Sequence, residues 1–133
     1  MDHDSHRHPP ALLLHRNEDA ATLAITAARQ AMARSGLTAN DIACCIVATL
    51  SAPTATPSIA CRVQAALDLP EDRPAFDVNA ACSGFIYAAA TAHGLLTTLG
   101  GQYALVIGCE ALSPHDGPDR PHDLCIVWRW SRR

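Results

Sequence analysis

This sequence is poor in charge, has no lysine and contains no long apolar run. A membrane span needs about 18 uncharged apolar residues, and no stretch here approaches that length. The N-terminal residues lack the basic start and apolar run of a secretory signal. Charged residues make up 17 % and the net charge is −3, so no charged field attracts nucleic acid or anionic lipid. We therefore expect a cytoplasmic protein that binds neither nucleic acid nor membrane.

Metal and disulfide sites are also not indicated. No two cysteines have the Cys-x-x-Cys spacing of a zinc or redox motif. The six cysteines are Cys44, Cys45, Cys61, Cys82, Cys109 and Cys125. Three histidines near the N-terminus, His3, His6 and His8, could bind a metal, but nothing downstream completes a site. We expect no metal, and we expect every cysteine except Cys82 to be a small buried apolar residue.

What the sequence does contain is a globular core, because 49 % of its 133 residues are hydrophobic. This length suits one small domain or a part of a larger one. Apolar residues recur at helical spacing in three segments and run almost continuously in three others. The helical segments are 18–35, 57–70 and 83–99, and the strand segments are 42–49, 75–78 and 103–109. Alternating helices and strands with short connections predict the α/β class, with a parallel sheet covered by helices.

Local signals mark where these helices begin and end. Asn17, Glu18 and Asp19 supply a cap and negative charge at the start of the first helix, and Gly36 followed by Leu37 can end it. Thr56-Pro57 looks like a cap followed by proline in the first helical position of the second helix. A sheet of only three strands would leave its edges and one surface uncovered, so the pattern predicts an incomplete fold.

Cys82 differs from the other cysteines because it lies where a short strand meets a long helix. The run 77–85 around it is rich in small residues, which suits a sharp strand-to-helix bend that presents a nucleophile. The free N–H groups and the dipole of the following helix would favour the thiolate. Burial in apolar surroundings would instead keep this cysteine inert.

The segment 75–87 resembles the active-site signature of β-ketoacyl-ACP synthase III. The resemblance extends over about residues 18–127. It includes the pairs and runs Gly36-Leu37, Asp41-Ile42, Ile46-Val47-Ala48-Thr49, Pro57-Ser58, Ala60-Cys61, Val63-Gln64, Leu105-Val106-Ile107-Gly108 and Asp119-Arg120. The family has the thiolase fold, so the resemblance implies part of the N-terminal half of that fold.

The resemblance also implies an acyltransferase of fatty acid biosynthesis. In the family, the cysteine that matches Cys82 takes an acyl group from acyl-CoA as a thioester. It then passes this group to the carbanion formed when malonyl-ACP loses CO₂. The family works as a homodimer and holds no permanently bound cofactor, since acyl-CoA is a substrate.

Two further residues match positions with family roles. Arg120 matches the arginine that lies against the CoA adenine, and the alternative is a solvated loop arginine. Thr56 stands where some members place a phenylalanine that reaches into the acyl pocket of the partner subunit. A smaller residue there implies a roomier pocket.

The family's catalytic histidine and asparagine have no match in this sequence. His93 falls in a predicted helix, and His115 and His122 fall in a loop. The N-terminal residues do not resemble the family's first strand or its CoA-binding arginine segment. We therefore expect a polar tail at 1–17, a partial thiolase-like domain at 18–127 and an aberrant tail at 128–133.

The tail at 128–133 suggests a slip of the reading frame. Its residues are Trp-Arg-Trp-Ser-Arg-Arg, where the family continues Phe-Gly-Asp-Gly-Ala-Gly-Ala. Codons TGG CGA TGG AGC CGG CGC, read from the second base, give Gly-Asp-Gly-Ala-Gly. This predicts a truncated synthase that cannot complete condensation. The alternatives are a non-catalytic α/β interaction module, a related starter-unit synthase of secondary metabolism, and an Arg/Trp patch that binds nucleic acid.

Overall fold

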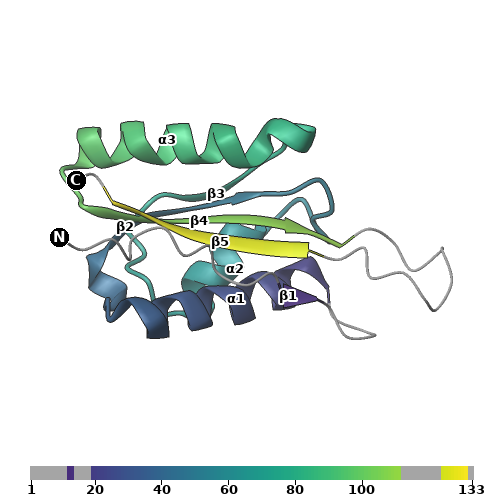
Figure 1. Ribbon diagram of the computed structural model, residues 1–133, viewed down its shortest axis with the longest axis horizontal. Helices are drawn as coiled ribbons and strands as arrows, with labels where there is room; N and C mark the ends of the chain where they lie inside the picture. The colour runs from purple at the N-terminus through teal and green to yellow at the C-terminus, as the bar shows by residue number, and fades with distance from the viewer. Residues whose placement is uncertain (1–11, 14–18, 112–123, 132–133) are drawn as a thin grey trace, which may run out of the picture.

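The computed structural model describes residues 12–13, 19–111 and 124–131. Three layers are visible in Figure 1: α3 lies on one face of a central sheet, and α1 and α2 lie on the other. The helices are α1 (Ala20–Ser35), α2 (Ile59–Ala66) and α3 (Gly84–Leu99), with short 3₁₀ turns at Ala39–Asp41 and Ala81–Ser83. The strands are β1 (Leu12–Leu13), β2 (Ile42–Ala48), β3 (Ala75–Val78), β4 (Tyr103–Glu110) and β5 (Leu124–Ser131). The predicted α/β class is confirmed.

The sheet has five strands in the order β1-β5-β4-β2-β3. Its centre is parallel as predicted, since β2 pairs in parallel with both β3 and β4. The expectation of three strands is wrong, because β5 pairs antiparallel with β4 along its whole length and β1 pairs antiparallel with β5. Apolar and polar residues alternate in Trp128-Arg129-Trp130-Ser131, which is a strand pattern that a reading of 128–133 as a tail overlooks.

The predicted polar tail at 1–17 is corrected in part, because Leu12–Leu13 form a strand within it. A two-residue strand carries too short a pattern to be found from sequence. The remaining residues of that segment, including His3, His6 and His8, lie outside the described residues. Among the described residues, no group of His, Cys, Asp or Glu could hold a metal ion.

One half of the core lies between the sheet and the pair α1 and α2. Leu23, Ile42, Val63 and Leu105 are among its buried residues. Asp19 caps α1 as predicted: its carboxylate accepts a hydrogen bond of 2.8 Å from the Thr22 N–H. The left-handed Gly36, with φ of 68°, ends this helix.

The other half of the core lies under α3. Ala88, Ala92 and Leu96 of α3 are fully buried against Ile46 and Val106 of the sheet. All seven residues of β2 are buried, so its continuous apolar run indicates a strand covered on both faces. No helix in the described part of the chain is long and apolar enough to cross a membrane.

The start of α2 differs from the prediction. Ser58 caps this helix and accepts a 3.1 Å hydrogen bond from the Cys61 N–H, and the helix begins at Ile59. Pro57 therefore precedes the helix and does not occupy its first position. The capping capacity of Ser58, two residues after Thr56, explains the later start.

Candidate active site

Cys82 lies at the junction predicted for it, between the end of β3 and the start of α3. After Val78 the chain turns sharply, and Ala81 has a φ of 48° in the left-handed region. A residue with a Cβ pays about 1 kcal/mol for that conformation. The turn Ala81–Ser83 then continues directly into α3. Cys82 is thus presented on a strained bend at the helix N-terminus, and its side chain is exposed.

Two glycines let α3 begin close against the ends of the strands. A Cβ on Gly84 would lie 3.3 Å from the Cβ of Ala48, the last residue of β2. A Cβ on Gly108 of β4 would lie 3.1 Å from the ring of Phe85. The missing side chains allow the first turn of α3 to pack directly on the sheet. The position of Cys82 is therefore fixed by close packing of the residues that follow it.

The other described cysteines differ from Cys82 in exposure. Cys44, Cys45 and Cys109 are buried, as expected, and Cys61 is half-buried. Burial raises the pKa of the Cys44 thiol to about 11 and also raises the pKa of Cys45. The Cys109 thiol donates to the Ala20 carbonyl oxygen at 3.2 Å. Among the described cysteines, Cys82 has the accessible thiol.

Apolar side chains are exposed on the segments that follow β2 and β3. Ile86 and Tyr87 on the first turns of α3 are 68 % and 55 % exposed, and Leu50 after β2 is 50 % exposed. Solvent-exposed apolar surface of this kind is available for an acyl chain or another polypeptide.

The loop 50–58 joins β2 to α2 and carries Thr56, whose side chain is exposed. Two carboxylates that sequence reasoning missed bind at its ends. Glu110 accepts from the Leu50 N–H at 2.8 Å, and Asp77 accepts from the Ile59 and Ala60 N–H groups, each at 2.9 Å. The sequence contains a signal for these two carboxylates, since each of them lies in an otherwise apolar strand.

The histidines of the sequence and Arg120 add nothing to the described geometry of this bend. His93 lies on the exposed side of α3, about 14 Å along the helix from Gly84. Arg120, His115 and His122 lie outside the described residues.

Comparison with known proteins shows which family this chain resembles. Residues 76–126, which include Cys82, match the family described as 3-oxoacyl-[acyl-carrier-protein (ACP)] synthase III. A β-ketoacyl-[acyl-carrier-protein] synthase III of Coxiella burnetii is 42 % identical over 112 residues, which are 84 % of this chain and 34 % of that protein. The chain belongs to this family. Synthase III 2 of Vibrio vulnificus is 48 % identical over 91 residues, 68 % of this chain and 25 % of the relative.

The fold agrees with the β-ketoacyl-ACP synthase III family as well. The crystal structure of 3-oxoacyl-[acyl-carrier-protein] synthase III from Aquifex aeolicus superimposes with a TM-score of 0.77 and 33 % identity. The match covers 90 % of this chain and 41 % of that one. The fold is therefore part of the thiolase-like fold of these synthases. The chain spans only a quarter to a third of the length of the two relatives above.

Proposed function

We propose that this chain carries the acyl-accepting half of a β-ketoacyl-ACP synthase III, with Cys82 as the nucleophile. The observation that supports this most is the exposed Cys82 on a strained strand-to-helix bend, inside the segment that matches the family. An accessible thiol at a helix N-terminus suits attack on a thioester, because the thiolate is the reactive form.

The reaction that we propose for Cys82 is a thioester exchange. Its thiolate attacks the carbonyl carbon of acyl-CoA, the new S–C bond forms, and the CoA thiolate leaves and takes up a proton. The Ser83 and Gly84 N–H groups already donate to the carbonyl oxygens of Ala80 and Ala81. We therefore assign the Cys82 N–H to the oxyanion that develops on the carbonyl oxygen.

We extend the proposal to the substrates and partners of the whole family. The acyl group would pass to malonyl-ACP with loss of CO₂, in the cytoplasm and in a homodimer. Arg120 would lie against the CoA adenine, and Thr56 would border the acyl pocket of the partner subunit. No permanently bound cofactor takes part in this chemistry. The family's histidine and asparagine match no residue here, so we expect acylation without condensation.

The test is the intact mass of the chain after exposure to acetyl-CoA. We expect one acetyl group per chain, no acetylation of the Cys82→Ala variant, and normal acetylation of Cys61→Ala, the matched control. Full acetylation of Cys82→Ala would refute the role of Cys82.

One observation favours a second function, that of a non-catalytic interaction module. α3 has no Asp, Glu, Lys or Arg in its 16 residues, and Ile86 and Tyr87 are exposed on it. Large apolar side chains on an uncharged surface are often covered by a partner. If α3 binds another polypeptide, Ile86→Asp abolishes self-association or binding to a full-length synthase, as measured by sedimentation. Monomers in both the wild type and the variant, with no synthase bound, would exclude this function.

A further inference from the structure

The loop 50–58 and the turn that presents Cys82 leave the sheet side by side. β2 and β3 are parallel neighbours, and Ala48 pairs with Val78 in the register. One residue further on, the Thr49 N–H donates to the Val78 carbonyl oxygen at 3.1 Å. The loop therefore starts next to the residues that lead into Cys82.

The first end of the loop is bound to the strand on one side of β2. Glu110 is the last residue of β4, and its two carboxylate oxygens accept from the Leu50 N–H at 2.8 Å and from the Ser51 hydroxyl at 3.0 Å. The Ser51 hydroxyl oxygen in turn accepts from the Ala111 N–H at 2.8 Å. Charge-assisted hydrogen bonds of this length hold a backbone firmly in place.

The second end of the loop is bound to the strand on the other side of β2. Asp77 of β3 accepts from the Ile59 and Ala60 N–H groups, one with each carboxylate oxygen. These N–H groups open α2 and have no partner within the helix. The negative charge also suits the positive end of the helix dipole. Asp77 thus fixes the end of the loop only two residues beyond Pro57.

We propose that Asp77 and Glu110 are positioning residues that fix the loop 50–58 and thereby place Thr56 at the acyl pocket of the partner subunit. Together they set which acyl chain lengths reach Cys82 of the partner subunit. This inference rests on the proposed function, because it assigns the loop to the acyl pocket. If the two carboxylates served stability alone, their loss would lower the melting temperature without changing the order in which acyl-CoAs react.

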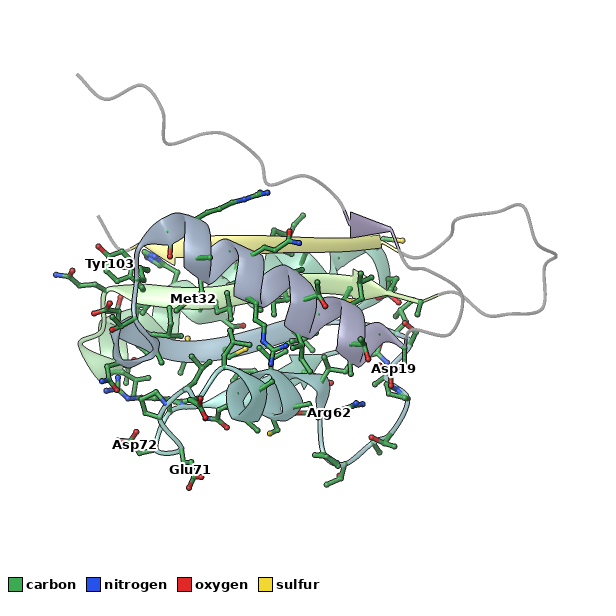
Figure 2. All side chains as sticks on the ribbon, turned by 90° about the horizontal axis from the view of Figure 1, so that it is seen from below. Asp19, Met32, Arg62, Glu71, Asp72 and Tyr103 are labelled. Carbon is green, nitrogen blue, oxygen red and sulfur yellow. The ribbon has the colours of Figure 1, made fainter. Side chains whose placement is uncertain are left out.

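The test compares Asp77→Ala and Glu110→Ala with the wild type. Glu71→Gln is the matched control, because Glu71 is an exposed carboxylate that points away from the molecule in the turn before β3 (Figure 2). Glu110→Gln is the conservative variant, since it keeps one acceptor for the Leu50 N–H. Two quantities are measured in the whole chain: hydrogen exchange of amides 50–60, and the ratio of acylation rates with hexanoyl-CoA and acetyl-CoA.

We expect exchange at Leu50 in Glu110→Ala, and at Ile59 and Ala60 in Asp77→Ala, to be at least about tenfold faster, with α1 unchanged. We expect the ratio of acylation rates to change at least about threefold in both variants. Glu110→Gln should recover part of both effects, and Glu71→Gln should match the wild type.

Unchanged exchange in both variants would overturn the positioning role, whatever the acylation shows. Faster exchange with an unchanged rate ratio would overturn the claim about chain length. A wild type that accepts no acyl group would refute the proposed function and the chain-length claim with it, while the exchange data would still decide whether the two carboxylates hold the loop.

Discussion

At the scale of single residues, accessibility separates Cys82 from the other described cysteines. A timed iodoacetamide reaction on the native protein at pH 8 should alkylate Cys82 first, at least about tenfold faster than Cys44 and Cys45. Burial shields those two thiols and raises their pKa, to about 11 for Cys44, so few of them are thiolates at this pH. Peptide mapping measures the order, and Cys45 reacting as fast as Cys82 would contradict the assignment.

Asp19 provides a second test at this scale. The hydrogen bond from the Thr22 N–H is the main cause that lowers its pKa below the ordinary 3.8. A lowered carboxyl pKa stabilises the fold above pH 3.8, and this contribution is lost as pH falls through the folded value. Asp19→Ala should cost about 1 kcal/mol at pH 7 and clearly less at pH 3.

Urea denaturation of the wild type and Asp19→Ala at both pH values measures this difference. The Arg62 guanidinium lies 3.4 Å from the Asp19 carboxylate but should add little, because the two side chains are 35 % and 42 % exposed. Arg62→Ala serves as the control. A difference between wild type and Asp19→Ala that is as large at pH 3 as at pH 7 would contradict the capping role.

At the scale of elements, substitution of glycine by alanine should have opposite effects on stability at two positions. Gly108→Ala places a Cβ 3.1 Å from the Phe85 ring and should destabilise the fold by about 1–3 kcal/mol. Gly94→Ala lies in the interior of α3 with nothing within 4 Å and should stabilise it by about 0.5–1 kcal/mol. Thermal unfolding measures both. Equal effects of the two substitutions would show that α3 does not pack on β4 as described.

The elements also show how far sequence reasoning reaches. α1, β2, α3 and β4 were predicted nearly to their ends, because each has a strong period or a continuous apolar run. β5 was missed because its Trp/Arg residues were taken as a tail, although their alternation is that of a strand. The bend at Cys82 was predicted from small residues between two elements. The sequence does not predict the roles of Asp77 and Glu110, because these roles depend on which strands lie beside β2.

At the scale of the whole molecule, we expect acylation without condensation. With acetyl-CoA and malonyl-ACP the chain should acquire an acetyl group and release no β-ketoacyl-ACP. The reason is that no residue of this sequence matches the family's histidine and asparagine. Mass spectrometry of the carrier protein measures the product, with a full-length family member as the positive control. Formation of β-ketoacyl-ACP by this chain would contradict the prediction.

The central claim is that Cys82 accepts the acyl group, and locating the adduct tests it most directly. The chain is incubated with acetyl-CoA, digested, and fragmented in the mass spectrometer to assign the modified residue. We expect a hydroxylamine-sensitive thioester on Cys82 and unmodified Cys44, Cys45, Cys61 and Cys109. An acetyl group on another cysteine, or none on Cys82 when a full-length synthase is acetylated under the same conditions, would contradict it.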